Sequence, residues 1–227
     1  MKITAVLPAF NSEKTLQKTY DAIPKNVISE VILVNNASSD NTRAIAEKIP
    51  GLMVINHERN RGYGGSQKTC YRTAIERGAD IVIMIHSDFQ YDPAYVPQMV
   101  QPIIEGRYDM VMGSRFLRED PRGAGMNWWR YWGNRLLSTL QARMLGVRLS
   151  EFHSGYRAYN RKLLTEVPYH TFSDDFVFDS QMIAAVARRG LKIGEVPIPT
   201  NYHNDCSSLS FLGGVKFGLA TLKTLFY

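Results

Sequence analysis

The chain has 227 residues, of which 44% are hydrophobic and 21% are charged. This composition is typical of a globular protein and excludes a disordered chain, and the length fits one α/β domain. The 27 Lys and Arg residues outnumber the 21 Asp and Glu residues, so the formal net charge of +6 favours partners such as phosphorylated ligands, anionic lipid or nucleic acid. The two cysteines, Cys70 and Cys206, do not make a disulfide framework and fit a reducing compartment.

Short apolar runs alternate with amphipathic segments through the first half of the chain. The runs lack polar alternation, which is typical of strands in a parallel sheet that helices cover on both faces. They lie at residues 3–7, 31–34, 52–55, 81–85 and 110–112. The mixed segments predict helices at residues 14–22, 42–48, 66–77 and 94–105, and Ser12 is available to cap the first. The pattern predicts a Rossmann-like, mostly parallel sheet flanked by helices in a single α/β domain.

The character of the chain changes after Arg115. A loop rich in Gly, Pro and Arg extends to residue 125, and an apolar and basic helix follows it to about residue 145. The three tryptophans lie at the start of this helix, at Trp128, Trp129 and Trp132. Aromatic side chains beside Arg130 and Arg135 favour a lipid headgroup region, and core packing of at least one Trp is an equal alternative. Beyond this helix the pattern predicts two strands and one helix, at residues 155–159, 192–196 and 179–188.

The two ends of the chain bear on its location. The apolar run after Met1 ends at Pro8, which is too short for a signal peptide, so we expect no secretion. The segment 209–227 is apolar and Gly-rich, but Lys216 and Lys223 interrupt it, which argues against a spanning helix of ~20 apolar residues. We therefore expect a cytoplasmic protein with peripheral contact at the inner face of the membrane.

Polar side chains directly follow the fourth apolar run, in the sequence His-Ser-Asp-Phe-Gln at residues 86–90. In open α/β sheets ligands bind beyond the carboxyl ends of the strands. Carboxylate and amide oxygens suit a hard cation such as Mg²⁺ or Mn²⁺, which also takes phosphate oxygens from a substrate and neutralises a departing diphosphate. Asp88 is therefore a candidate metal ligand, and capping of the next helix by Asp88 is an equal alternative.

Two further polar segments follow other predicted strands. Residues 35–42 carry amide and hydroxyl side chains that are able to bond a base or ribose, although capping explains Ser39 or Asp40 equally well. Residues 60–68 form a Gly-rich turn that opens a helix, and free N–H groups in such a turn favour phosphate. The spacing matches neither the dinucleotide-binding fingerprint nor the P-loop, and most Gly clusters are simply turns.

The order and spacing of these segments together resemble family 2 glycosyltransferases of the GT-A fold, especially dolichyl-phosphate mannosyltransferase-like enzymes. The resemblance covers about residues 3–210. Its motifs lie at residues 6–11, 35–42, 60–65, 86–93, 113–116, 154–159 and 195–199. It implies one catalytic domain, residues 1–210, with a donor half of about 1–115 and an acceptor half of about 116–210. Residues 211–227 would form a C-terminal amphipathic segment.

The resemblance implies roles for individual residues. The nucleotide-sugar donor would contact Pro8, Ala9, Asn11, Glu13, Asn35, Asn36, Ser38, Gly62, Lys68, His86, Ser87 and Asp88. The metal ion would be held by Asp88, Gln90 and His86. The acceptor would contact Arg115, Arg122, Arg130, Ser154 and Arg157, and the candidate catalytic residues are Asp88, Arg115 and Asp175. For Arg157 a structural salt bridge is a strong alternative.

This sequence departs from the family pattern at the expected donor site. Members usually have Asp-x-Asp where this chain has His86-Ser87-Asp88, and an acidic pair where it has Asn35 and Asn36. Two or more negative charges are therefore missing. His86 would ligate Mn²⁺ through a neutral imidazole, or would bond the diphosphate while Asp88 alone contacts the metal. In addition, Asn201 stands where a basic residue is expected.

The resemblance implies an inverting, metal-dependent transfer of one sugar from a GDP- or UDP-linked donor, with a polyprenyl phosphate as the favoured acceptor. A phosphate is already ionised at neutral pH and needs cations such as Arg115, Arg122 and Arg130, whereas a hydroxyl acceptor would need a base such as Asp174 or Asp175. The missing acidic residues also leave open a non-catalytic nucleotide-sugar binding module. We expect no nucleic acid partner, since no basic-aromatic motif accompanies the charge. A membrane protein partner is compatible with the sequence.

Overall fold

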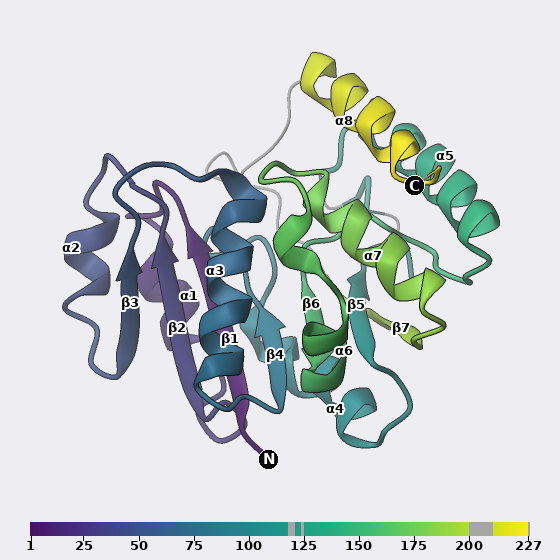
Figure 1. Ribbon diagram of the computed structural model, residues 1–227. Coiled ribbons are helices and arrows are strands. Elements are labelled where there is room, and N and C mark those ends of the chain that lie inside the picture. The colour runs from purple at the N-terminus through teal and green to yellow at the C-terminus, as the bar shows by residue number, and fades with distance from the viewer. Residues whose placement is uncertain (118–120, 124, 200–210, 227) are drawn as a thin grey trace.

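The computed structural model describes residues 1–117, 121–123, 125–199 and 211–226. Its strands form one sheet in the order β3-β2-β1-β4-β6-β5-β7 (Figure 1). The strands are β1 (Ile3–Ala9), β2 (Glu30–Asn35), β3 (Leu52–Asn56), β4 (Ile81–Met84), β5 (Met110–Ser114), β6 (Arg157–Asn160) and β7 (Ile193–Pro197). The α-helices are α1 (Leu16–Asp21), α2 (Thr42–Ala46), α3 (Gly62–Glu76), α4 (Val96–Ile104), α5 (Trp128–Leu145), α6 (Arg161–Glu166), α7 (Phe178–Arg188) and α8 (Phe211–Lys223). The predicted α/β domain with a mostly parallel sheet is confirmed.

Strand β6 runs against both of its neighbours. β1 pairs in parallel with β2 and β4, β2 with β3, and β5 with β7, whereas β6 is antiparallel to β4 and β5. Because of this direction, β6 begins at the edge of the sheet where the parallel strands end. The segment that precedes it, residues 151–156, therefore lies beside the carboxyl ends of β4 and β5.

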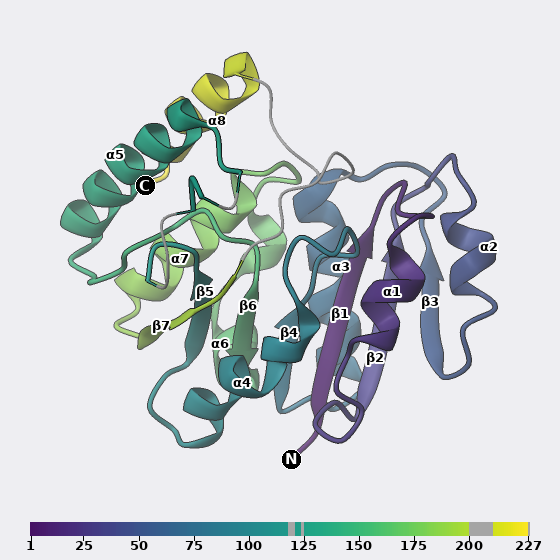
Figure 2. The same ribbon diagram turned by 180° about the vertical axis from the view of Figure 1, so that it is seen from behind.

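Helices cover both faces of the sheet. α3, α6 and α7 lie on the face in front in Figure 1, and α1 and α4 lie on the opposite face, which Figure 2 shows. In β1, Ala5 and Leu7 belong to the core on one face and Val6 to the core on the other, and all three are fully buried. The continuous apolar runs of the sequence follow from this burial on both faces.

The predicted strands are all present, and several helix boundaries differ from the prediction. α3 begins about one turn earlier than expected. The last predicted helix of the first half is divided into a 3₁₀-helix, Pro93–Tyr95, which the side chain of Asp92 caps, and α4. Ser12 does not cap α1: Thr15 occupies the N-cap, and the Ser12 hydroxyl lies 2.8 Å from the hydroxyl of Ser87. Ser12 instead joins two loops at the carboxyl edge.

Helices α5 and α8 lie side by side beyond the carboxyl edge of the sheet, as both views show (Figures 1 and 2). Two glycines of α8 face α5. A Cβ atom on Gly214 would lie 3.3 Å from the ring of Trp129, and one on Gly218 would lie 3.3 Å from Leu137. The missing side chains let the helices approach closely. No helix in the described part of the chain is both long and apolar enough to cross a bilayer.

The side chain of Arg157, at the start of β6, is fully buried. Its Nε donates to the carbonyl of Ser154 at 2.8 Å and its Nη2 to the carbonyl of Phe152 at 3.1 Å. Its Nη1 lies 3.2 Å from the carboxylate of Asp179 and donates to the carbonyl of the same residue at 3.1 Å. One guanidinium thus links the segment before β6 to α7.

Replacing Arg157 with Met should lower the free energy of unfolding by about 3–5 kcal/mol, because the buried Asp179 carboxylate would lose its cation. Equilibrium unfolding in urea measures this. The matched control is Arg72→Met, whose side chain is 62% exposed and whose only described partner is Glu76 at 3.9 Å. The control should change stability by no more than about 0.5 kcal/mol. Equal effects of the two substitutions would contradict the role given to the buried pair.

Candidate functional site

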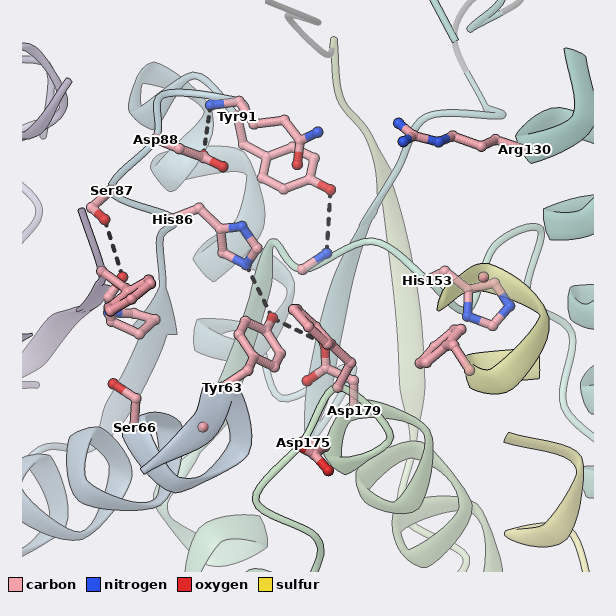
Figure 3. Close-up of a pocket in the computed structure, with 18 of the residues that line it drawn as sticks. Tyr63, Ser66, His86, Ser87, Asp88, Tyr91, Arg130, His153, Asp175 and Asp179 are labelled. Atoms are coloured by element: carbon pink, nitrogen blue, oxygen red, sulfur yellow. Dashed lines mark hydrogen bonds between the residues drawn. The ribbon is translucent and has the colours of Figure 1, made fainter. Parts of the chain in front are cut away.

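A cavity of about 1130 Å³ opens at the carboxyl edge of the parallel strands. Its walls come from the loops after β1, β2, β4 and β5, the first turns of α3, the segment before β6, and helices α5, α7 and α8. Figure 3 shows Ser87 and Asp88 on one side of this space and His153 and Arg130 on the other. The predicted donor half and acceptor half therefore face one continuous cavity.

Most of the predicted donor residues line this cavity. They are Pro8, Ala9, Asn11, Glu13, Asn36, Gly62, His86, Ser87 and Asp88. The described non-glycine residues with a positive φ are Asn11, Ala37 and Phe89, at 51°, 58° and 55°. Each of them follows a strand of the parallel sheet at this same edge. Such backbone conformations are uncommon outside glycine and cluster at functional sites, which agrees with a binding role for these loops.

The loop after β1 is joined to the loop after β2 by hydrogen bonds. The backbone N–H of Asn11 donates to the hydroxyl of Ser38 at 3.0 Å. The carboxylate of Glu13 accepts from the backbone and side-chain N–H groups of Asn41 at 3.0 and 2.9 Å, and the Asp40 carboxylate accepts from the N–H of Glu13 at 3.0 Å. The side chains of Glu13 and Ser38 thus fix the loops, and only Glu13 of the two also lines the cavity.

The amide of Asn36 is fully used in holding the Gly-rich loop. Its Nδ2 donates to Asn60 Oδ1 at 2.9 Å and to the carbonyl of Gly62 at 3.1 Å. Its Oδ1 accepts from the N–H of Arg61 at 2.9 Å and lies 2.8 Å from Nδ1 of His57. Since an amide oxygen only accepts, the Nδ1 of His57 carries the proton. Nothing in the sequence around His57 marks it as part of the site, so its role was not predicted.

The N–H groups of the three glycines in the Gly-rich turn are already hydrogen-bonded, so the expectation that they are free for phosphate is wrong. Gly64 and Gly65 donate to the carbonyl of Asp174 at 2.6 and 3.3 Å, and Gly62 donates to Asn60. A Cβ atom on Gly62 would lie 2.4 Å from the carbonyl oxygen of Asp174. These glycines let the segment before α7 pack against the start of α3. Their function in this structure is close backbone approach.

Asn35 and Lys68 lie outside the cavity lining. Nδ2 of Asn35 donates to Asn56 at 2.8 Å and its Oδ1 accepts from the N–H of Ser38 at 3.1 Å. This amide thus holds the loop after β2 against the end of β3. Lys68 donates to the carbonyl of Phe172 and to the Asp174 carboxylate, the latter at 2.8 Å, and faces a separate cavity of about 510 Å³. Both side chains are committed to contacts within the protein.

The loop after β4 presents Asp88 and Gln90 to the cavity. The Asp88 carboxylate accepts from the N–H of Gln90 at 3.0 Å, which closes a tight turn, and capping of the following 3₁₀-helix falls to Asp92. The hydroxyl of Ser87 donates to the carbonyl of Pro8 at 3.1 Å and anchors the loop to β1. Among the described residues no group of three or more His, Cys, Asp or Glu side chains gathers. A cation at this turn would have one carboxylate, that of Asp88, with neutral side chains and substrate oxygens as its other ligands.

His86 belongs to a hydrogen-bonded chain that reaches α7. The Tyr63 hydroxyl donates to the carboxylate of Asp179 at 3.1 Å and lies 3.1 Å from Nε2 of His86 (Figure 3). Burial, together with the Asp179 carboxylate, raises the pKa of Tyr63 well above its usual value, so the hydroxyl keeps its proton. That proton goes to Asp179, and Nε2 of His86 must therefore be the donor to Tyr63. In a neutral imidazole this leaves a lone pair on Nδ1, which points away from Tyr63.

Arg115 is paired with Glu151, a residue that sequence analysis missed. The Arg115 guanidinium donates to the fully buried Glu151 carboxylate through Nε at 2.7 Å and through Nη2. The backbone N–H of Arg115 and the side chain of Asn134 also donate to it, at 2.8 and 2.9 Å. Burial opposes the charge of Glu151, but the Arg115 guanidinium and its hydrogen bonds hold the pKa of this carboxyl below its usual value. The pair adds little net charge to the cavity.

The other predicted acceptor residues divide into two groups. Arg130 and Asp175 line the cavity. Arg122 lies outside the lining, with its guanidinium 4.5 Å from the ring centre of Tyr131. Ser154 and Arg157 are fully buried behind the lining, where their polar groups are hydrogen-bonded within the protein. The structural salt bridge considered for Arg157 is therefore observed.

A sequence model described as glycosyl transferase family 2 matches residues 4–167. A UDP-N-acetylglucosamine–dolichyl-phosphate N-acetylglucosaminyltransferase of Methanococcus voltae is 27% identical over 216 residues, covering 88% of this chain and 86% of the relative. An undecaprenyl-phosphate mannosyltransferase of Micrococcus luteus is 28% identical over 229 residues, covering 95% and 89%. The crystal structure of glucosyl-3-phosphoglycerate synthase from Mycobacterium tuberculosis with Mn²⁺, UDP and glucosyl-3-phosphoglycerate matches with a TM-score of 0.75 and 24% identity, covering 99% of this chain and 78% of that one. This likeness confirms the GT-A fold.

The packing role of the Gly-rich turn is tested by Gly64→Ala. The new Cβ atom would lie 2.4 Å from the carbonyl oxygen of Ser173 and 2.8 Å from Cβ of Phe178, so stability should fall by about 1–3 kcal/mol. In the control Gly133→Ala, within α5, the Cβ atom meets nothing within 4 Å and should stabilise the helix by up to about 1 kcal/mol. Unfolding in urea measures the stability of both variants. Similar changes in the free energy of unfolding would contradict the packing role of Gly64.

Proposed function

The chain belongs to glycosyl transferase family 2 and is a glycosyltransferase, and we propose that it transfers one sugar from a nucleotide-sugar to a polyprenyl phosphate. The observation that carries the proposal is the continuous cavity, which joins the loops after β1, β2 and β4 to a basic and apolar region under α5 and α8. The transfer inverts the anomeric carbon: a phosphate oxygen of the acceptor attacks it, and the bond to the nucleoside diphosphate breaks on the opposite side. Relatives named for dolichyl and undecaprenyl phosphate support this acceptor.

The donor half offers a set of groups that suits a metal ion bound together with a diphosphate. Mg²⁺ in proteins is often held by one or two carboxylates, with substrate phosphates and water completing its shell. Asp88 supplies one carboxylate and Gln90 an amide oxygen on the same turn. We propose that these two residues hold Mg²⁺ or Mn²⁺, which would stabilise the charge of the departing diphosphate. The Mn²⁺ and UDP bound together in the structural neighbour agree with this.

We propose that His86 is a further ligand of this cation, through Nδ1. Its Nε2 donates to Tyr63, so the lone pair of Nδ1 is available to a cation. Histidines that ligate metals usually donate their other ring N–H to a protein group, which fixes the tautomer and the ring orientation. Here that group is the hydroxyl of Tyr63, which is itself held by its hydrogen bond to Asp179.

The acceptor half suits an anionic head with a hydrocarbon chain. A phosphate monoester is ionised at neutral pH, so it needs cations and no general base. Arg115 and Arg130 line this part of the cavity, and planar guanidinium groups bind phosphate oxygens well. Beyond them the lining is apolar, with Leu137 of α5 and Phe217 and Leu222 of α8. A hydroxyl acceptor has one supporting observation, since Asp175 lines the same cavity as a possible base.

The outer face of α5 and α8 suits a membrane surface. Trp128, Trp132 and Leu136 are 73%, 61% and 63% exposed at four-residue spacing along α5. Val215 and Leu219 are 49% and 60% exposed on α8. Basic side chains on the same helices, Arg135, Lys216 and Lys223, are also exposed and would meet anionic headgroups. We propose peripheral contact at this face, which would bring the cavity to a lipid-borne acceptor.

The proposed reaction is tested with wild-type protein, Mn²⁺ or Mg²⁺, a panel of UDP- and GDP-sugars, and undecaprenyl phosphate. Asp88→Asn should slow transfer at least about 100-fold, because the cation loses its carboxylate. The control Asp92→Asn should remain close to wild type, since Asn also caps a helix. Transfer that is unaffected by a chelator and by Asp88→Asn would contradict the metal site, and transfer to undecaprenol but not to undecaprenyl phosphate would contradict the acceptor.

The membrane face is tested by flotation with vesicles of phosphatidylcholine and phosphatidylglycerol. Replacing both Trp128 and Trp132 with Ser should reduce the vesicle-bound fraction about 10-fold or more, because two large apolar groups leave the interface. Ile104→Ser is the control, since Ile104 is 40% exposed on α4, at the opposite end of the molecule (Figure 1). Equal binding of the double variant, the control and the wild type would leave the tryptophans with a packing role only.

A further inference from the structure

His153 lies in the segment before β6 and lines the cavity. Both of its ring nitrogens are buried, and neither has a hydrogen-bond partner among the described residues. The ring packs edge-on against Phe217 of α8, with ring centres 5.4 Å apart. A buried polar atom without a partner costs about 1–3 kcal/mol, and in a native structure it calls for an explanation. The ring itself lines the cavity, so a ligand bound there is the candidate partner for these nitrogens.

The backbone on both sides of His153 is fixed. The Arg157 guanidinium donates hydrogen bonds to the carbonyls of Phe152 and Ser154, the two residues that flank His153. In addition, the N–H of Phe152 donates to the hydroxyl of Ser138 at 3.2 Å. The segment therefore has little freedom to carry the ring toward a partner elsewhere. Rigid support of an unpartnered polar side chain is typical of residues that are held ready for a substrate.

The charge state of the ring follows from its surroundings. Burial lowers the pKa of His153 to about 4, although the nearby Glu151 carboxylate acts in the opposite direction. The ring is therefore neutral at physiological pH, with one nitrogen as donor and the other as acceptor. An ionised phosphate only accepts hydrogen bonds, so the N–H side of this ring matches it.

The position of His153 separates it from the donor half. Figure 3 places it across the cavity from Ser87 and Asp88, on the side of Arg130. Its near neighbours are the Arg115–Glu151 pair and the apolar side chains of α5 and α8. The ring thus stands at the boundary between the polar and the apolar parts of the acceptor half.

We propose that His153 donates a hydrogen bond to the phosphate of a prenyl phosphate acceptor, whose first isoprene units lie against Phe217 and Leu137. This inference rests on the proposed function and assigns a binding residue that sequence analysis did not identify. Arg130 supplies positive charge, and His153 fixes the orientation of the phosphate relative to the hydrocarbon chain. The acceptor is recognised by the combination of anion and prenyl chain.

The first test measures binding without turnover. Farnesyl phosphate should raise the melting temperature of the wild-type protein, whereas farnesol or inorganic phosphate at the same concentration should raise it less. His153→Leu should lose most of the shift with farnesyl phosphate. His153→Gln, which keeps an N–H donor, should recover part of it, and the exposed His170→Leu should bind like wild type. Equal shifts in wild type and His153→Leu would overturn the proposal.

The second test separates a binding role from a structural one. In the transfer assay His153→Leu should raise the KM for undecaprenyl phosphate at least 10-fold while the KM for the nucleotide-sugar changes less than about 2-fold. Because the substitution removes two unpaired buried nitrogens, the melting temperature without ligand should not fall. A fall in melting temperature with both KM values changed would show a structural role and overturn the proposal. If wild-type protein does not use undecaprenyl phosphate at all, the proposed function fails first, independently of His153.

Discussion

The buried guanidinium of Arg157 holds together the parts of the chain from which the site is built. It bonds the carbonyls of Phe152 and Ser154 and pairs with Asp179 on α7. Asp179 in turn accepts from Tyr63 and from Gln67, both on α3. A continuous set of hydrogen bonds thus runs from the acceptor segment before β6, through α7 and α3, to His86 in the loop after β4. Arg157 is fully buried and Tyr63 and His86 are partly buried, and each has a partner in this set, so loss of one member leaves an uncompensated neighbour.

The side chains of Asn35 and Asn36, where the resemblance implies acidic residues, act as amide donors in this arrangement. Nδ2 of Asn36 donates to the Oδ1 of Asn60 and to the carbonyl of Gly62. Nδ2 of Asn35 donates to the Oδ1 of Asn56. A carboxylate at either position would place oxygen against oxygen, because it cannot donate. The loops of the donor half therefore require hydrogen-bond donors at these two positions. His86 is also a donor, through its hydrogen bond to Tyr63.

Helices α5 and α8 form the apolar wall of the cavity. Gly214 and Gly218 let α8 lie close against Trp129 and Leu137, which places Phe217 beside His153. The inner side of the pair is an apolar wall of the cavity, and the outer side exposes Trp128, Trp132 and other apolar groups. The same two helices therefore separate the proposed prenyl site from the proposed membrane face.

The sequence by itself determined the strands, the family and the place of the loop that carries Asp88. Continuous apolar runs such as residues 31–34 identify strands because both faces of the sheet are buried, and polar residues after such a run, as at Asp88, lie at the carboxyl edge of any parallel sheet. The tertiary structure alone decided the antiparallel direction of β6, because a run of four residues has no intrinsic direction within a sheet. That direction brings His153 to the cavity, places Glu151 behind Arg115, and turns Arg157 inward, away from the cavity. The partners of these side chains come from α3, α5, α7 and α8, and contacts over such separations leave no local pattern in the chain.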